Sequence, residues 1–290
     1  MKIGLFDSGL GGLTVLTKIL EKYKDLDCGI LNLVYLADTI NAPYGARSQQ
    51  ELKNIINKNI DFLYKQNCDF AVIACNSASI FKKHTDNNTN SYLDNCIDMV
   101  TPTVNFCKDN LYKNNLIFAT TATINSNIYK NTFQDSGLKL DQYSLSELAS
   151  LIDNNINIKT IDDYIKIEMG KFFAELNILE NNTLKNQDNI LEKNTASYDT
   201  KYDSIILGCT HYPLVIDIFK KYCRDIKIVN PADPVSDFVI SKIKKLNLSK
   251  ENKNSAISLQ VFLTKKNDYI ERYILENIKV ESLEIEVIEI

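Results

Sequence analysis

The sequence predicts an α/β fold of two similar domains, each with a mainly parallel sheet flanked by helices. Short apolar runs alternate with segments of helical spacing, an order that is typical of parallel strands joined by crossover helices. Two strand-like segments, Phe70–Ala74 and Ser204–Leu207, both lead to a cysteine. The chain has 290 residues, of which 44% are hydrophobic, so it is long enough to bury two domain cores.

The first part of the chain alternates strand and helix patterns. The loop after the first strand, Asp7–Gly12, is rich in glycine. The second expected helix places its apolar residues on one face: Leu52, Ile55, Ile56, Ile60 and Leu63. The expected elements, in the order strand, helix, strand, helix, strand, are Lys2–Phe6, Leu13–Tyr23, Leu31–Leu36, Gln49–Gln66 and Phe70–Ala74. Ligands of such sheets bind beyond the carboxyl ends of the strands, so we expect the site there.

A second series of strands begins at Leu116–Ala119 and leads to Ser204–Leu207. Between them, Asn181–Tyr202 is rich in Asn, Lys and Thr and has little periodicity, which indicates a surface insertion. At the end of the chain, Val280–Ile290 alternates apolar residues with glutamates. This alternation favours an edge strand with one face in water.

The composition argues against several classes of protein. The net charge is −4 and no block of Lys or Arg occurs, so we expect no nucleic-acid partner. No apolar run approaches the roughly 18 residues that a membrane helix needs. The charge at Lys2 comes too early for a signal peptide. We therefore expect a cytoplasmic protein without a membrane partner.

The seven cysteines show no disulfide or zinc pattern. Their number is odd and no Cys-x-x-Cys pair occurs, so most of them are expected to be small buried hydrophobic residues. Cys75 and Cys209 are exceptions because each follows an apolar strand and a small residue, and each precedes two hydrogen-bonding residues. A helix after each strand would direct N–H groups at the sulfur and favour thiolate. The alternative is that both cysteines only fill strand ends.

Two thiols in matching contexts suit proton transfer on both faces of one carbon. Inverting an α-carbon requires a base on one side and an acid on the other. The reference pKa of a thiol, about 8.5, lies near the working pH of such a pair. Two sulfurs at near-attack range, roughly 3.5 Å each from one carbon, would stand about 7 Å apart, so a disulfide between them is not expected.

Six short segments near the expected strand ends carry a recognisable pattern. They are Gly4–Thr14, Ala37–Thr39, Pro43–Gly45, Ala74–Ser79, Ala119–Ser126 and Leu207–Leu214. In these segments the chain resembles bacterial glutamate racemases, and the resemblance extends along most of its length. Each segment alone is weak evidence, whereas all six in this order are highly specific.

The resemblance implies two α/β domains related by a pseudo-twofold axis, with the active site in the cleft between them. The first domain would comprise 1–98 and 213–290, and the second 99–212. The family uses neither pyridoxal phosphate nor a metal, so no cofactor is expected. The substrate would be L- or D-glutamate, and D-glutamate would serve peptidoglycan synthesis and cell shape. We also expect the protein to form a homodimer.

The resemblance assigns roles to individual residues. Cys75 would be the base for D-glutamate and Cys209 the base for L-glutamate, with Asp7 and His211 assisting. Asp38 would be an accessory residue near the chemistry. The substrate contacts carried over are Asp7, Ser8, Tyr44, Gly45, Asn76, Ser77, Thr123, Thr210 and His211. None of the three arginines lies in a motif, so neutral donors would hold the substrate carboxylates.

The chain departs from the family pattern at several places. Ser77 stands where the family usually has Thr, which retains the hydroxyl. Asp153 stands where the family usually has Glu, and we expect it to be accessory to the second thiol. Because Asp is one methylene shorter, its carboxylate is expected to reach a proton partner only through water. Leu145 and Ser146 replace the usual Cys and Pro, and the Asn181–Tyr202 insertion is longer than usual.

Other functions remain open at this point. An aspartate racemase is the nearest enzymatic alternative, and a degenerate racemase fold that only binds ligands is another. A hydrolase that uses Cys209 and His211 would leave Cys75 unexplained. The Ser8–Gly12 loop lacks the lysine of a P-loop and the full dinucleotide fingerprint, so nucleotide binding is disfavoured.

Overall fold

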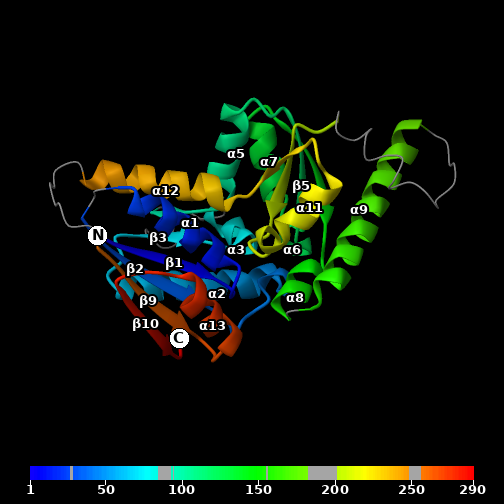
Figure 1. Ribbon diagram of the computed structural model, residues 1–290. Helices are drawn as coiled ribbons and strands as arrows, with labels where there is room; N and C mark the ends of the chain where they lie inside the picture. Colours follow the sequence, from blue (N-terminus) through cyan, green and yellow to red (C-terminus); the bar gives the residue numbers. More distant parts are fainter. Residues whose placement is uncertain (27–28, 84–92, 94, 155, 182–200, 248–255) are drawn as a thin grey trace. The chain divides into compact units, whose positions relative to one another are not determined.

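The computed structural model describes residues 1–290 except 27–28, 84–92, 94, 155, 182–200 and 248–255 (Figure 1). It divides into two compact units, Met1–Thr103 with Pro231–Ile290, and Val104–Asn230. Both boundaries lie further along the chain than the divisions at 98/99 and 212/213 expected from the sequence. The second boundary is late because β8 (Lys227–Val229) pairs with β7 (Ser204–Gly208).

The first unit contains a six-stranded sheet with the order β10-β9-β2-β1-β3-β4. Every neighbouring pair in it is parallel. Its strands are β1 (Lys2–Asp7), β2 (Ile30–Ala37), β3 (Phe70–Ile73), β4 (Cys96–Ile97), β9 (Ala256–Leu263) and β10 (Ser282–Val287). The central strands β1 and β3 are buried almost throughout, as the apolar runs in the sequence require.

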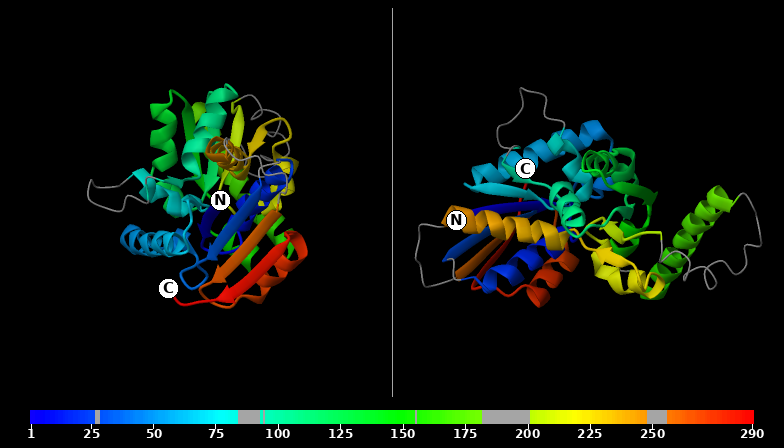
Figure 2. Two further views of the ribbon diagram at one scale, coloured as in Figure 1. Left: turned by 90° about the vertical axis from the view of Figure 1, so that its left-hand side faces the viewer. Right: turned by 90° about the horizontal axis from the view of Figure 1, so that it is seen from above.

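Helices lie on both sides of this sheet (Figure 2). The helical elements of the first unit are α1 (Gly12–Lys24), η1 (Tyr44–Ala46), α2 (Gln49–Lys65), α3 (Asn76–Ser79), η2 (Ile80–Lys83), α12 (Ala232–Asn247) and α13 (Asp268–Asn277). Helix α1 packs against α12, and α2 packs against β1, β2 and β3. Ser48 caps α2 reciprocally with Glu51, which explains why this helix begins at Gln49. Helix α5 (Val100–Asp109) carries the chain into the second unit.

The second unit contains a four-stranded parallel sheet with the order β6-β5-β7-β8. Its two further strands are β5 (Asn114–Ala119) and β6 (Lys139–Ser144). The helical elements are α6 (Thr121–Asn125), α7 (Ile128–Asp135), α8 (Leu148–Asp153), α9 (Ile158–Asn181), η4 (Tyr212–Val215) and α11 (Ile216–Tyr222). The core packs around Phe118, whose ring lies 6.0 Å from that of Phe172 and 5.9 Å from that of Phe219.

The structure confirms the predicted class of fold, the strands and helices expected in the first part of the chain, and the two strands expected in the second series. Strand β10 is an edge strand, as expected, and it lies beside β9 in the left view of Figure 2. The proposed insertion lies almost wholly in 182–200, outside the described residues. In the part of the chain that the structure describes, no helix combines the length and apolarity needed to cross a membrane.

Candidate active site

Three adjacent strands of the first unit place polar residues at one edge of the sheet. Asp7 ends β1, Asp38 directly follows β2, and Cys75 lies two residues after β3. The strand order β2-β1-β3 makes these carboxyl ends neighbours. Asp7 and Asp38 are fully buried, and 6% of the Cys75 surface is exposed. Buried carboxylates need hydrogen-bond donors, which the surrounding loops supply.

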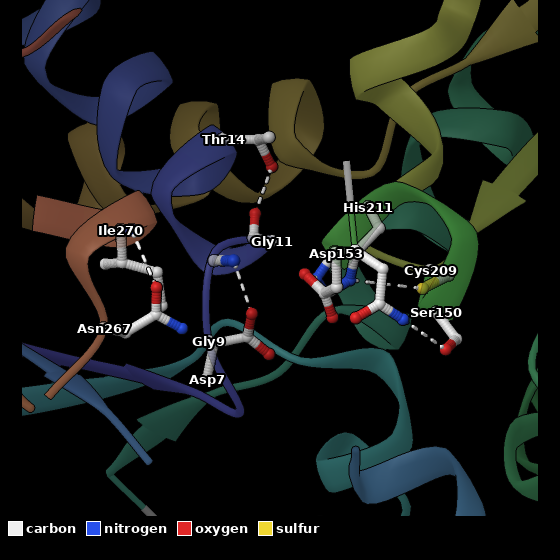
Figure 3. Close-up of polar contacts among 12 residues, drawn as sticks. Asp7, Gly9, Gly11, Thr14, Ser150, Asp153, Cys209, His211, Asn267 and Ile270 are labelled. Atoms are coloured by element: carbon white, nitrogen blue, oxygen red, sulfur yellow. Dashed lines mark hydrogen bonds and ion pairs between the residues drawn. The ribbon is translucent and has the colours of Figure 1, made fainter. Parts of the chain in front are cut away.

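Asp7 organises the glycine-rich loop that follows β1. Its Oδ2 accepts a hydrogen bond from the N–H of Gly12, at the start of α1 (Figure 3). The hydroxyl of Tyr35 donates to the carbonyl of Gly9, in the same loop, over 2.6 Å. A Cβ on Gly12 would meet Asp7 Cβ at 2.4 Å and the Tyr35 hydroxyl at 2.7 Å. Position 12 therefore requires glycine because Asp7 approaches the helix start so closely.

Asp38 is the acceptor of a buried hydrogen-bond network. Its Oδ2 accepts from the Tyr44 hydroxyl over 2.6 Å and from Asn59 Nδ2 over 3.2 Å. Asn41 Nδ2 donates to both oxygens, over 2.9 Å to Oδ1 and 3.0 Å to Oδ2. The Thr264 hydroxyl adds a bond of 3.1 Å to Oδ1. The carboxylate is thus held from four side chains, which suits a positioning group better than a mobile proton carrier.

The Tyr44 hydroxyl is committed to this network. It donates to Asp38 and accepts a hydrogen bond of 2.7 Å from Asn59 Nδ2. Burial raises the pKa of Tyr44 well above its ordinary value, and the negative charges of Asp38, Cys75 and Asp7 raise it further. Tyr44 therefore stays protonated, and its hydroxyl proton is occupied by Asp38.

Cys75 is the N-cap residue of α3. Its carbonyl accepts hydrogen bonds from the N–H and the hydroxyl of Ser79, over 3.0 and 2.8 Å. Helix α3 contacts η1, the turn that carries Tyr44 and Gly45. Asn76 and Ser77 are both buried in this short helix. The structure therefore brings the thiol and the neighbouring candidate residues of the first unit to one end of its sheet.

The second unit repeats this arrangement with different side chains. Cys209 follows β7, and Thr123 lies in α6, which follows the adjacent β5. Asp153 is the last residue of α8, which follows β6 on the other side of β5. Thr123 and Thr210 are both buried. Thr120 caps α6 by accepting from the N–H of Thr123, so this threonine pair is partly explained by capping.

Cys209, His211 and Asp153 form a line of polar contacts in the second unit (Figure 3). The Cys209 sulfur lies 3.8 Å from His211 Nδ1. On the other side of the ring, His211 Nε2 lies 2.8 Å from Asp153 Oδ1. The expectation that Asp153 reaches its proton partner only through water is wrong for this contact.

His211 is buried beside two groups that favour its charged form. Burial alone would lower the pKa of His211, but the Asp153 carboxylate and Cys209 raise it well above its ordinary value. The imidazole is therefore protonated at neutral pH. The Nδ1 atom of this charged ring lies beside the Cys209 sulfur.

Tyr212 connects the turn after Cys209 to the segment that precedes α8. Its hydroxyl donates to the carbonyl of Leu145 over 2.7 Å, and the side chain is fully buried. Burial raises the pKa of Tyr212 well above its ordinary value, with a further contribution from Cys209. Leu145 precedes α8, so this bond helps to fix the helix that carries Asp153.

Sequence reasoning missed the residues that support the candidate side chains. Asn59 and Tyr35 lie within an expected helix and strand, and Thr264 is 226 residues from Asp38 in the chain. A polar residue inside an apolar helix face was the one available signal, at Asn59. The other cysteines that the structure describes are buried, as expected. Cys28, His84 and most of Asn181–Tyr202 lie outside the described residues.

Two curated relatives match most of the chain. The glutamate racemase of Hydrogenobaculum sp. is 30% identical and covers 98% of this chain and 98% of its own length. That of Fusobacterium nucleatum is also 30% identical and covers 87% of this chain and 84% of its own length. The chain belongs to the glutamate racemase family. No model of a protein family matches it.

Solved structures of glutamate racemases share the fold. The isoform RacE1 of Bacillus anthracis has a TM-score of 0.76 at 22% identity, and covers 99% of this chain and 97% of its own. The Francisella tularensis enzyme, solved with D-glutamate, has a TM-score of 0.71 at 22% identity, with coverages of 98% and 97%. An aspartate racemase from Picrophilus torridus is less similar, with a TM-score of 0.53 at 20% identity and coverages of 83% and 94%.

Among the described residues, no group of three His, Cys, Asp or Glu side chains is arranged to hold a metal ion. The polar groups at the strand ends are instead hydrogen-bond donors, carboxylates and thiols.

Proposed function

We propose that this member of the glutamate racemase family interconverts L- and D-glutamate with Cys75 and Cys209 as its two proton-transfer groups. The observation that carries the proposal is the placement of one thiol at a strand end of each unit, among buried polar residues. Family membership supports glutamate as the substrate, and the geometry of each unit supports the thiols as the reactive groups.

The proposed step balances as a transfer of protons alone. With L-glutamate, the Cys209 thiolate removes the α-proton, so that a Cα–H bond breaks and an S–H bond forms. The Cys75 thiol then gives its proton to the opposite face of the carbanion and becomes a thiolate. With D-glutamate the two thiols exchange these roles. No electron is transferred, and exchange with solvent restores the starting protonation of the thiols.

The surroundings of each thiol support these starting forms. His211, whose pKa is raised by Asp153, lies 3.8 Å from the Cys209 sulfur, where its charge would pair with the thiolate that a base requires. On the Cys75 side, Tyr44 is bonded to the Asp38 carboxylate, and its pKa is also raised by the charges of Cys75 and Asp7. Nearby carboxylates favour the neutral form of a thiol. Cys75 would therefore start as the acid when L-glutamate binds. Asp153 would act by keeping His211 charged.

Neutral donors would bind the substrate carboxylates and stabilise the negative charge of the carbanion. The candidates are Ser8, Asn76, Ser77, Thr123 and Thr210, all of which are buried at strand ends. Because the hydroxyl proton of Tyr44 is committed to Asp38, we propose that this turn contributes the backbone N–H groups of Tyr44 and Gly45.

Circular dichroism of L-glutamate during incubation with the purified protein tests this function. The signal is expected to decay to zero in the presence of EDTA and hydroxylamine, because the proposed reaction uses neither a metal nor pyridoxal phosphate. Loss of turnover under these conditions, with recovery on addition of a metal or pyridoxal phosphate, would contradict the mechanism.

L-aspartate is the matched alternative substrate in the same assay. We expect no comparable decay, because the two curated relatives described above are glutamate racemases. Turnover of aspartate without turnover of glutamate would replace the proposed substrate. Binding of glutamate without any racemisation would instead support a degenerate binding protein.

We also propose a cytoplasmic, homodimeric enzyme that supplies D-glutamate for peptidoglycan synthesis. This role follows from the proposed product. Depletion of the protein is then expected to make growing cells dependent on added D-glutamate, and growth without such dependence would contradict the role.

A further inference from the structure

Asn59 is a buried polar residue on the apolar face of α2. The helix buries its other core positions with aliphatic side chains: Leu52, Ile56, Ile60 and Leu63. Asn59 lies seven residues after Leu52 and four before Leu63, on the same helical face. Its side chain is 0% exposed. A buried amide among aliphatic residues requires an explanation in its contacts.

The amide of Asn59 uses both of its N–H groups on the Asp38 network. Nδ2 donates to the Tyr44 hydroxyl over 2.7 Å and to Asp38 Oδ2 over 3.2 Å. Asn59 Oδ1 has no hydrogen-bond partner within the described part of the chain. An apolar residue of similar size would avoid this buried unsatisfied acceptor. Stability alone therefore does not account for asparagine here, whereas a need for two donors does.

The two acceptors of Asn59 connect it to the surroundings of Cys75. Tyr44 lies in η1, and η1 contacts α3, which begins directly after Cys75. Tyr44 also lies close enough to Cys75 for the thiolate charge to raise its pKa. Asn59 thus donates a hydrogen bond to η1, the turn that contacts α3, although Asn59 itself lies within α2.

We infer that Asn59 is a positioning residue for the Cys75 side of the site. It fixes the Tyr44 hydroxyl on Asp38 and thereby holds η1 against the start of α3. Cys75 is kept nearly inaccessible by this arrangement, and the backbone of Tyr44 and Gly45 is kept in place. The effect on turnover rests on the proposed racemase function, whereas the effect on the accessibility of Cys75 does not.

Alkylation by iodoacetamide, followed by peptide mass spectrometry, measures each thiol separately in the whole protein. In Asn59→Leu, Cys75 is expected to react about tenfold faster than in the wild type, because local opening of η1 exposes it. Cys209 is the internal control and is expected to react at its wild-type rate. Asn54→Leu is the matched variant, since Asn54 lies on the exposed side of the same helix. It is expected to change neither rate.

Tyr44→Phe completes a double-mutant cycle. If Asn59 acts through the Tyr44 hydroxyl, the variant Asn59→Leu/Tyr44→Phe is expected to show the Cys75 rate of Tyr44→Phe alone. Additive effects would show that Asn59 acts by another route and would overturn the inference. An unchanged Cys75 rate in Asn59→Leu would overturn it as well. Equal acceleration of Cys75 and Cys209 would indicate general destabilisation and would have the same consequence.

Steady-state kinetics then link the positioning role to turnover. Asn59→Leu is expected to raise KM more than it lowers kcat, because the turn that it loosens carries proposed substrate contacts. A fall in kcat with unchanged KM would overturn the proposed route through this turn. If the wild-type protein does not racemise glutamate, the proposed function fails, and the alkylation rates still decide the role of Asn59.

Discussion

The two cysteine-bearing strand ends differ in the groups that surround the sulfur. Cys209 faces His211, whose raised pKa keeps a positive charge 3.8 Å away. Cys75 instead lies near Tyr44, which stays neutral. The Tyr44 hydroxyl donates a hydrogen bond to the Asp38 carboxylate. Each unit therefore has a parallel sheet with a thiol at a strand end, but this thiol lies next to a cation in the second unit and near acidic groups in the first.

This difference matters for a reaction that needs a base and an acid at the same moment. Two thiols in identical surroundings would be equally protonated, so neither would be preferred as the base. Unequal surroundings of two titratable groups can separate the roles of base and acid. We propose that this difference between the two units favours the pair of forms that reacts with L-glutamate, namely a Cys209 thiolate and a Cys75 thiol.

Replacing either thiol is expected to have the largest effect. Cys75→Ser and Cys209→Ser should each reduce racemisation by about a thousandfold, because a serine hydroxyl is too weak a base at neutral pH. Cys68→Ser and Cys223→Ser, which also remove buried thiols, are the matched controls and should retain most of the activity. Circular dichroism of L-glutamate measures all four. Near-normal turnover in either of the first two variants would rule out the two-thiol mechanism.

The loop beside Asp7 provides a test of the packing in the first unit. Gly12→Ala is expected to lower the free energy of unfolding by roughly 1–3 kcal/mol, because its Cβ would collide with Asp7 and Tyr35. Gly9→Ala is the control in the same loop, since its Cβ would meet only Ile270 Cδ1, at 3.7 Å. Urea unfolding compares them, and equal losses would show that the close approach at Gly12 is unimportant.

The contact between Asp153 and His211 is expected to have a smaller effect on turnover. Asp153→Asn should lower kcat/KM about tenfold, because an uncharged partner no longer favours the imidazolium beside Cys209. Asp153→Glu should be tolerated. The proton NMR titration of His211 should show its pKa falling in Asp153→Asn, and His211→Gln assigns the signal. Unchanged turnover in Asp153→Ala would make Asp153 an ordinary helix-end residue.

Stability should depend on pH through the same pair. The pKa of His211 is raised in the folded protein, so its charged contact stabilises the fold fully below the unfolded value of about 6.5. This contribution is lost as the pH rises through the folded pKa. Asp153 is 38% exposed, so the difference between wild type and Asp153→Asn should be about 1 kcal/mol or less. Urea unfolding should show the difference at pH 6 and none at alkaline pH, and the opposite trend would contradict the assignment.

The sequence allowed prediction of those features that depend on local pattern. Apolar runs predicted β1, β3 and β7, and the residues after them predicted Cys75 and Cys209 at strand ends. The networks could not be predicted, because they join segments far apart in the chain, such as Asp38 and Thr264.

Helix periodicity predicted the buried face of α2 only in part. Leu52, Ile56, Ile60 and Leu63 are buried as expected, whereas Ile55 is only half-buried. Asn59 was missed because periodicity counts apolar residues, and a buried amide at an apolar position depends on partners from other elements. The reach of Asp153 was misjudged because side-chain length was considered without the position of α8.

The most direct test of the two-thiol proposal is proton NMR of L-glutamate with the purified protein in D₂O. Two bases on opposite faces predict that the first D-glutamate formed carries deuterium at the α-carbon, while the remaining L-glutamate keeps its hydrogen. The reason is that the product receives a solvent-derived proton from one thiol, while the other thiol holds the substrate proton. Deuterium in both enantiomers from the earliest time points would contradict the proposal, because a single exchanging base would then serve both faces.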